Sequence, residues 1–377
     1  MITQKRFSDG NLSISRVVVF IALIMLMFVL QHPVVLIAGS LICAGYAIYS
    51  YWPIGVKNGQ LILFFTCLTL FLPGFIKPEH GFSPIFYAFS TVSVFFAAKA
   101  ISNYSNYVFL AAFRIIFIFS ILAIALILYA YWGHPEPFGE VIEGSSTNGI
   151  PAYLIVLQIG LSLCHFLVRG QLPLLSPILT GSVAFFGNGR GSLVVAGIII
   201  SVSFIFNLAL NNKQSRARKA IFVFIFCLIV LILTQHGAEL LDLLTSYTKL
   251  SVGLEDSNRL NILNQYINKL NPWTVFVGAE YHGTVIEYKH NGNPHISYIR
   301  THSFFGLPLT LLAIASPLLV LFYKKPFKLR LVFFTFISLA AIRAGSEPIF
   351  FPTLLDFFYF LYFFIYIKQS GVNNYQQ

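Results

Sequence analysis

Long runs of apolar residues dominate the chain, separated by short polar segments. Crossing a hydrocarbon core of about 30 Å takes about 20 apolar residues in a helix, so each run predicts one membrane span. We predict twelve spans, several of them short: 14–31, 33–50, 60–76, 84–101, 110–131, 150–168, 172–187, 191–210, 219–236, 303–322, 330–343 and 349–367. The expected fold is an all-α, polytopic bundle of transmembrane helices.

One long hydrophilic stretch, 237–302, interrupts this pattern before the tenth predicted span. Within it, Leu260, Leu263, Ile267 and Leu270 recur at the spacing of a helix face, which predicts interfacial helices in the loop. The loop divides the chain into three segments: 1–236 with nine predicted spans, 237–302, and 303–377 with three predicted spans and a polar tail.

The composition supports a bilayer as the solvent of this protein. Hydrophobic residues make up 57% of the 377 residues and charged residues only 10%, whereas a soluble domain carries about 25% charged residues. The four cysteines all fall inside apolar runs, which favours small packing residues over a disulfide framework.

The net charge of +11 predicts the orientation of the spans. In a soluble protein this charge would indicate nucleic-acid binding, but in a membrane protein cations gather in the cytoplasmic loops. The two most basic short loops, 211–219 and 324–330, fall on the same side when the N-terminus is cytoplasmic. We therefore expect both termini inside, the loop 237–302 outside, and no nucleic-acid partner.

A glycine-rich turn between two spans carries the first candidate residue. Arg190 lies within Gly187-Asn188-Gly189-Arg190-Gly191-Ser192 on the predicted outer side. Glycines expose backbone N–H groups at a helix start, where phosphate binds, and a guanidinium adds two parallel donors. The alternative is an arginine that only anchors the helix end at the membrane surface.

The long loop carries two further candidates, Arg259 and His295. Arg259 follows Ser257-Asn258, and taken alone it would be an ordinary solvated charge. His295 precedes the tenth span, where a histidine is either structural or a general base, since its ordinary pKa is about 6.5. No dense set of Cys, Asp or Glu surrounds His290 and His295, so we expect no metal site.

Taken together, these segments resemble the O-antigen polymerase (Wzy-type) and O-antigen ligase superfamily of bacterial envelopes. Members show a small-residue-Arg-Gly step opening a span, then a large periplasmic loop with Ser-x-Arg, Asn-Pro-Trp…Gly and His-Asn-x-Tyr-Leu…Gly-Leu elements. The matching residues are Arg190-Gly191, Ser257-x-Arg259, Asn271-Pro272-Trp273…Gly278 and His295…Tyr298-Ile299…Gly306-Leu307. Ile296 stands where the family has Asn, so His302 is the alternative base.

The resemblance implies a metal-independent glycosyltransferase without a cofactor, at the periplasmic face of the bacterial inner membrane. It would join repeat units carried on undecaprenyl pyrophosphate into a surface polysaccharide, with a chain-length regulator as protein partner. Arg190 and Arg259 would hold the pyrophosphate, and His295 would be the base. The implied substrate-binding residues are Gly191, Trp273, Tyr281, Tyr298, His302 and Glu280. The fallback bases are Glu280, Glu287 and Glu143.

Two alternative functions stay open. An O-antigen ligase would pass the glycan to lipid A-core and belongs to the same superfamily. A polysaccharide transporter or flippase belongs to another class, in which internal repeats and charged residues within the spans are common. The sequence shows no repeat, and almost every predicted span lacks a charge, so the polymerase is preferred.

Overall fold

A computed structural model provides the structure of the chain. It describes the residues 2–51, 58–76, 81–134, 137–139, 141, 148–187, 189–209, 235, 239 and 257–369. Helices dominate these ranges and no strand occurs within them, which confirms the expected all-α class for the described part of the chain.

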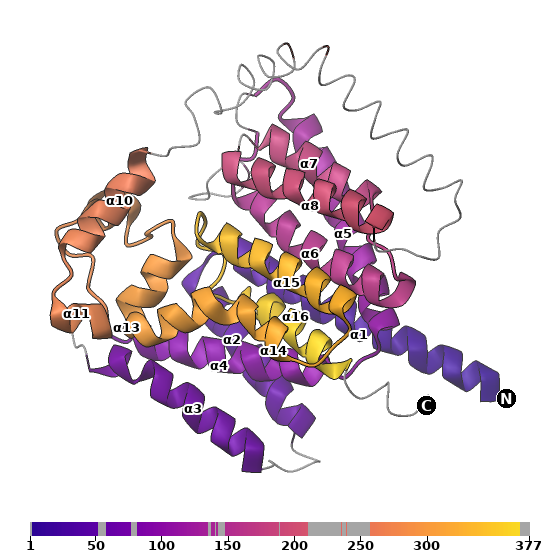
Figure 1. Cartoon of the computed structure of the whole chain (residues 1–377), viewed down its shortest axis with the longest axis horizontal. Helices are drawn as coiled ribbons and strands as arrows, with labels where there is room; N and C mark the ends of the chain where they lie inside the picture. Colours follow the sequence, from indigo (N-terminus) through magenta and orange to yellow (C-terminus); the bar gives the residue numbers. More distant parts are fainter. Residues whose placement is uncertain are drawn as a thin grey trace. The chain divides into compact units, whose positions relative to one another are not determined.

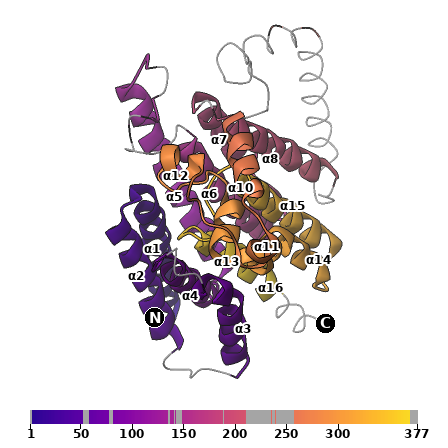
Figure 2. The ribbon, with the colours of Figure 1, turned by 90° about the vertical axis from the view of Figure 1, so that its left-hand side faces the viewer.

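Most of the helices are labelled in Figure 1, and α12 is labelled in Figure 2. Their bounds are α1 Ile2–Leu30, α2 Pro33–Tyr51, α3 Asn58–Phe75, α4 Ser83–Ile101, α5 Asn106–Ala130, α6 Gly149–Arg169, α7 Leu175–Phe186, α8 Arg190–Ala209, α10 Ser257–Asn268, α11 Pro272–Val277, α12 Val285–His290, α13 Ser297–Ala315, η3 Ser316–Leu318, α14 Leu319–Phe322, α15 Phe327–Ala344 and α16 Asp356–Lys368.

Seven helical stretches in the described residues are long and apolar enough to cross a membrane. They are Leu12–Leu30, Pro33–Tyr51, Ser83–Ile101, Asn106–Ala130, Gly149–Arg169, Arg190–Ala209 and Ser297–Phe322. The protein is therefore a multi-pass helical membrane protein, and each of these stretches coincides with a predicted span.

Three other predicted spans have a different form. Helix α7 has only 12 residues, and α15 carries three cations, Lys328, Arg330 and Arg343. The predicted span 349–367 becomes helical only at Asp356, because the Asp356 carboxylate accepts the N–H groups of Phe351 and Thr353 and fixes a non-helical turn. The resulting 13-residue helix α16 is about 20 Å long. The predicted span 219–236 lies almost wholly outside the described residues.

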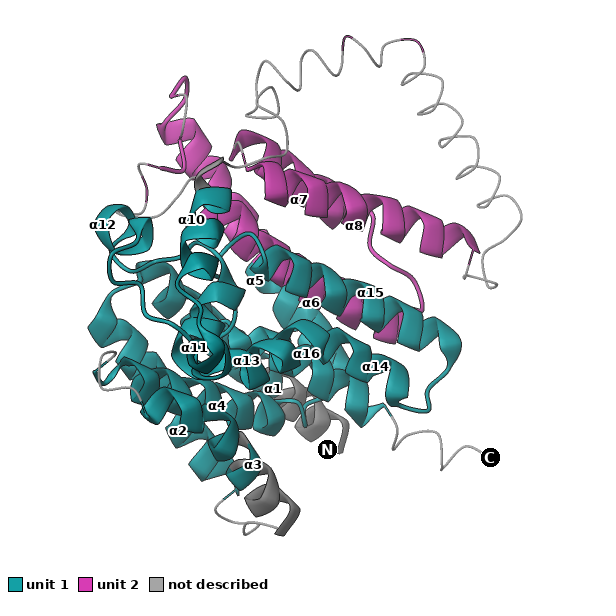
Figure 3. Ribbon diagram, turned by 60° about the vertical axis from the view of Figure 1, so that its left-hand side comes forward, with its two compact units in different colours: residues 1–116, 257–377 teal, residues 117–256 magenta. Residues whose placement is uncertain are grey.

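The chain forms two compact units, shown in Figure 3. Unit 1 contains residues 1–116 and 257–377, and unit 2 contains 117–256. The units do not coincide with the three segments expected from the sequence. The units are defined by contacts between residues, whereas the segments were defined by the predicted membrane spans.

Helix α4 is central to unit 1, where it packs against α2, α3 and α16. Ala97 and Ala98 of α4 are fully buried. The hydroxyl of Ser40 on α2 donates to the hydroxyl oxygen of Ser90 on α4 at 2.9 Å. Such small side chains and polar pairs join helices in a bilayer, where lipid tails remove the hydrophobic drive between them. At the C-terminal end of α4, the Nζ of Lys368 donates to the backbone carbonyls of residues 102–104.

Helix α13 is broken within its length at Gly306, whose φ of 72° lies in the left-handed region. A Cβ at Gly306 would lie 1.8 Å from the carbonyl oxygen of Phe276, and one at Gly278 would lie 1.9 Å from that of His302. Helix α11 therefore approaches α13 closely at two points, and both require glycine. This double contact fixes the start of α13 against the long loop.

Helices α10, α11 and α12 form a lobe beside the start of α13, visible in Figures 1 and 2. Its core consists of Ile262, Tyr266, Ala279, Ile286 and Ile299. The helix expected within the loop is confirmed as α10. The residues of α10 that are buried in the lobe core are Ile262 and Tyr266. Other apolar side chains of α10 remain about half exposed, namely Leu260 at 46% and Ile267 at 50%.

Unit 2 is built around α6, whose side chains from Pro151 to Cys164 are buried. Gln158 of α6 donates to Ser162 at 2.8 Å, and Thr180 of α7 donates to the Gln158 side-chain oxygen at 3.3 Å. The Asn207 side chain of α8 pairs with both the N–H and the carbonyl of Leu172. These polar links fix the packing of α6, α7 and α8 without a charged residue.

Candidate functional site

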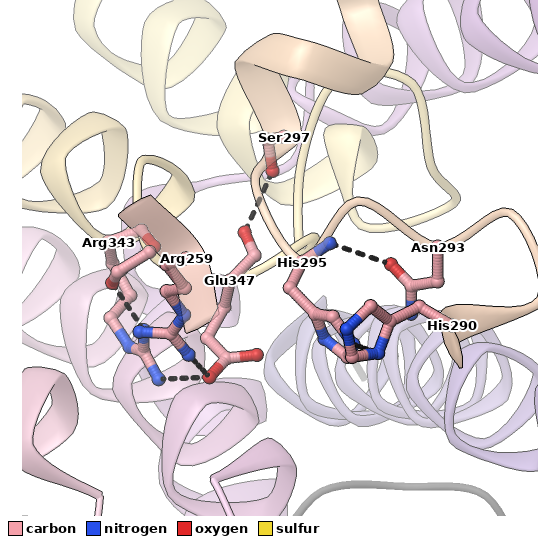
Figure 4. Close-up of polar contacts among 8 residues, drawn as sticks. Arg259, His290, Asn293, His295, Ser297, Arg343 and Glu347 are labelled. Carbon is pink, nitrogen blue, oxygen red and sulfur yellow. Dashed lines mark hydrogen bonds and ion pairs between the residues drawn. The ribbon is translucent and has the colours of Figure 1, made fainter. Parts of the chain in front are cut away.

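Two arginines converge on one carboxylate in unit 1. The Arg259 Nη2 lies 2.9 Å from Glu347 Oε1, and the Arg343 Nη2 lies 3.6 Å from the same oxygen (Figure 4). Arg343 and Glu347 are almost fully buried, whereas the Arg259 side chain is 24% exposed. Arg259 is therefore an ion-paired, partly covered residue, and the expectation of an ordinary solvated charge does not describe it.

Three separate elements place these side chains together. Arg259 lies in the first turn of α10, Arg343 in the last turn of α15, and Glu347 in the turn that follows α15. The backbone of Glu347 is fixed at both ends, since its N–H donates to the Arg343 carbonyl at 3.1 Å and its carbonyl accepts from Ser297 Oγ at 2.8 Å. The ionic cluster thus ties the loop lobe, the start of α13 and the end of α15 to one another.

A third guanidinium lies next to this cluster. Arg300 donates through Nη1 to the Pro348 carbonyl at 3.4 Å and through Nη2 to Asn293 Oδ1 at 3.3 Å. Pro348 directly follows Glu347, and the charge of Arg300 also acts on the buried Asp356 carboxyl group. Guanidinium groups gathered in this way are suited to bind an anion.

His295 belongs to a pair of histidines that lies near the ionic cluster in unit 1. Its Nε2 lies 3.1 Å from Nδ1 of His290, at the end of α12, and its backbone N–H donates to Asn293 Oδ1 at 3.1 Å. His295 has a φ of 55°, a left-handed conformation that is uncommon for a residue other than glycine. In the view of Figure 4 the Glu347 carboxylate lies between this pair and the two arginines.

His302, the alternative base, is buried, and both of its ring nitrogens have partners within the protein. Nε2 lies 2.8 Å from the Val275 carbonyl, which can only accept, so Nε2 carries the proton. Nδ1 then accepts from the Tyr266 hydroxyl at 2.8 Å. Burial raises the pKa of Tyr266, which keeps this donor neutral. The arrangement describes a structural histidine that joins α10, α11 and α13.

The aromatic residues expected to bind sugars differ in their surroundings. Trp273 is 62% exposed in the first turn of α11, so its ring is open to a ligand. Tyr281 packs against the lobe core, and burial raises its pKa. Tyr298 donates to the Ala341 carbonyl at 2.6 Å and stacks on Phe351. Of these three side chains, Trp273 presents the ring that a sugar could reach most easily.

Two of the fallback bases can be placed. Glu287 lies in the first turn of α12 and accepts from the Gly283 N–H at 2.8 Å and from His282 at 3.1 Å. The Gly283 N–H and then the His282 ring lower the pKa of Glu287, which makes it a weaker base. Glu280 is half-buried between α11 and α12, and Glu143 lies outside the described residues.

Arg190 and Gly191 begin α8 in unit 2 and are described within that unit alone. The neighbouring glycines have a packing role there. A Cβ at Gly187 would lie 2.4 Å from Pro151 Cγ, and one at Gly189 would lie 2.4 Å from Asn148 Oδ1. Close approach to the start of α6 thus explains both glycines without a bound phosphate, and the phosphate-binding role of Arg190 stays a prediction.

An apolar cavity of about 470 Å³ lies within unit 1, between α3, α4, α13, α14 and α16. Aromatic and aliphatic side chains form most of its lining, including Phe71, Phe95, Leu309, Leu312, Phe360 and Phe363. Its volume corresponds to about sixteen water-sized groups. This is enough for part of a hydrocarbon chain.

The cavity begins close to the ionic cluster. Thr301, which lines the cavity, lies one helical turn of about 5.4 Å beyond Ser297 on α13. Its hydroxyl is 2.9 Å from the Ser297 carbonyl and 2.7 Å from that of Phe351, another lining residue. A ligand with an anionic head and an apolar tail could therefore contact both features.

Sequence reasoning missed three residues of this site, Arg300, Arg343 and Glu347. Arg343 is the last residue of the predicted span 330–343, and its partner Glu347 lies just beyond that span. Glu347 is separated from Arg259 by 88 positions, so their pairing could not be read from spacing.

Among the described residues, no group of three or more His, Cys, Asp or Glu could hold a metal ion. No protein-family model matches the chain, and neither a curated protein nor a solved structure is detectably similar to it. The candidate site therefore rests on its own geometry and on the sequence motifs.

Proposed function

We propose that the protein is a polymerase of lipid-linked oligosaccharides, joining repeat units carried on undecaprenyl pyrophosphate. The observation that supports it most is the convergence of Arg259 and Arg343, with Arg300 beside them, close to both a histidine pair and an apolar cavity. A diphosphate, an acceptor hydroxyl and a polyprenyl tail each have a matching feature within unit 1.

The proposed reaction uses the arginines as electrostatic stabilisers. Arg259 and Arg343 hold the diphosphate oxygens, where negative charge grows as the bond to the sugar breaks. The electron pair of that bond leaves with the lipid diphosphate, which needs no proton because it is a stable anion. Arg343 is a guanidinium beside Arg259 that the sequence did not single out, and Arg190 stays a predicted further cation for the diphosphate.

His295 is the proposed general base. Its ring takes the proton of the acceptor hydroxyl while that oxygen forms a bond to the anomeric carbon. His290, 3.1 Å away, orients the ring of His295 and shares the proton between the two imidazoles. His302 is left out of the reaction, because Tyr266 and the Val275 carbonyl occupy both of its nitrogens.

The proposed placement puts both termini in the cytoplasm, twelve spans in the bacterial inner membrane and the loop lobe in the periplasm. It is supported by the basic loops 211–219 and 324–330. The exposed apolar side chains Leu260, Ile267 and Trp273 suit a lobe that lies against the membrane surface. A chain-length regulator is the proposed protein partner.

The decisive experiment supplies the purified full chain, in lipid nanodiscs, with an undecaprenyl-pyrophosphate-linked oligosaccharide. Longer lipid-linked products should form, with one undecaprenyl pyrophosphate released per linkage, and Arg259→Ala should abolish them. Lys289→Ala, which removes an exposed cation of the same lobe, is the matched control. Product that forms only when lipid A-core is added would indicate the ligase. Transfer of oligosaccharide across a vesicle membrane without elongation would indicate a transporter and contradict the proposal.

A further inference from the structure

The two arginines proposed to hold a diphosphate already have an anionic partner. Arg259 and Arg343 both approach the same oxygen of Glu347, at 2.9 and 3.6 Å. Carboxylate and phosphate oxygens are the same kind of acceptor for a guanidinium. The Glu347 side chain therefore uses the donors that a bound diphosphate would need.

The Glu347 contact is not the strongest that an arginine can make. A carboxylate binds a guanidinium best through two parallel bonds, one to each oxygen. Here a single oxygen is shared by two guanidinium groups, and the Arg343 contact is long. A diphosphate offers more oxygens and more negative charge, so it can satisfy both arginines at once.

The ionic contact at Glu347 is largely out of water. Arg343 is 1% exposed and Glu347 is 4% exposed. A buried guanidinium is costly without an anionic partner, so an anion that enters the cluster would take the place of the Glu347 carboxylate.

Glu347 is held by its backbone, and its side chain can rotate without moving the turn. The backbone bonds to Arg343 and Ser297 do not involve the carboxylate. The Arg259 side chain, with 24% exposure, is the member of the cluster that a ligand can reach first. Displacing the carboxylate would therefore leave the backbone hydrogen bonds to α13 and α15 in place.

We propose that Glu347 is an internal competitor for the diphosphate site. It pairs with Arg259 and Arg343 in the ligand-free protein, is displaced by the lipid diphosphate, and returns to help release the lipid diphosphate product. This inference rests on the proposed function, because it assumes that these arginines bind the diphosphate.

Glu347→Gln tests the competition directly, with inorganic pyrophosphate as the probe. The full chain in nanodiscs is titrated calorimetrically in the wild-type and variant forms. Removing the competing charge should lower the dissociation constant for pyrophosphate about ten- to a hundredfold. Lys289→Gln changes an exposed charged side chain of the same lobe, and it should leave the constant unchanged.

A stability measurement separates competition from misfolding. Without its carboxylate partner, the buried Arg343 should lower the Tm of Glu347→Gln in the absence of anions. Added pyrophosphate should then raise the Tm of the variant more than that of the wild type. Glu347→Asp keeps the charge on a shorter side chain and should bind pyrophosphate with an affinity between those of wild type and Glu347→Gln.

The outcomes distinguish this inference from the function on which it rests. If the wild type binds pyrophosphate, Arg259→Ala abolishes binding, and Glu347→Gln binds equally or more weakly, Glu347 is a structural clamp and the competitor role is overturned. If neither the wild type nor Glu347→Gln binds pyrophosphate, the proposed diphosphate site is overturned together with it.

Discussion

Two histidines seven residues apart have different surroundings, although the sequence made both of them candidate bases. His302 is buried between Tyr266 and the Val275 carbonyl, whereas the His295 ring lies against the imidazole of His290. Sequence spacing favoured His295, but the partners of His302 lie 27 and 36 positions away in the chain. Only the folded lobe brings them together.

His295→Gln should therefore lower the rate of glycosyl transfer about 10²- to 10⁴-fold, as expected for loss of a general base. Glutamine keeps a hydrogen-bonding side chain but cannot take a proton. The rate of elongation of the lipid-linked oligosaccharide measures this, with unchanged protein level and Tm. Full activity in His295→Gln would reduce the residue to a positioning role.

His302→Gln should lower the stability of the protein more than the rate of glycosyl transfer. Loss of two buried hydrogen bonds, each contributing about 1 kcal/mol, should lower the Tm. Activity per folded molecule should stay close to that of the wild type. A stable but inactive His302→Gln would instead assign the proton transfer to His302.

Arg343→Lys tests the second cation of the site. Lysine keeps the charge but lacks the planar fork that binds two oxygens, so we expect at least a tenfold loss of elongation in protein that still inserts. Arg343→Ala is a poorer test, because breaking a buried ion pair costs about 3–5 kcal/mol of stability. Arg330→Lys, at the other end of α15, should keep wild-type activity.

At the scale of the helices, the glycines of the motifs have a geometric explanation. Gly278 and Gly306 were quoted from the sequence as spacing markers, and the structure shows that each allows one helix to approach the backbone of another. Both have positive φ values, 92° and 72°, which a side chain would disfavour. The sequence could indicate that glycine mattered here, but not which backbone it contacts.

Gly306→Ala should prevent α11 from docking on α13. The added Cβ would lie 1.8 Å from the Phe276 carbonyl oxygen, a distance that requires backbone movement. We expect loss of the folded lobe, measured as protease cleavage in the loop and a lowered Tm. Gly197→Ala is the control, since α8 is helical there and nothing lies within 4 Å of the new methyl group. An unchanged Tm in Gly306→Ala would contradict the close contact.

The spans were predicted well where the sequence is a long apolar run. They were predicted less accurately where polar residues within the run form structural hydrogen bonds. The span 349–367 contains Asp356, whose carboxylate accepts the N–H groups of Phe351 and Thr353 and so fixes a non-helical turn before α16. Hydropathy averages over such a residue. A local pattern of Pro348, Pro352 and Asp356 could have signalled the later start of the helix.

At the scale of the whole molecule, topology is the first test. Reporter fusions at Asn212 and Gly292 should lie on opposite sides of the membrane, because the first position is in a basic loop and the second in the lobe. Fusions at residue 326 should agree with Asn212. The same side for Asn212 and Gly292 would contradict the proposed periplasmic lobe.

Unit 1 is made from the first and the last parts of the chain, and this affects its synthesis. Helix α4 packs against α16, and Lys368 closes the end of α4. At about 5–20 residues per second, ribosomes need about 13–50 s to translate from residue 116 to the C-terminus. The first four helices must wait in the bilayer for that time, and a chaperone or a temporary partner helix would protect their unpaired polar faces until translation ends.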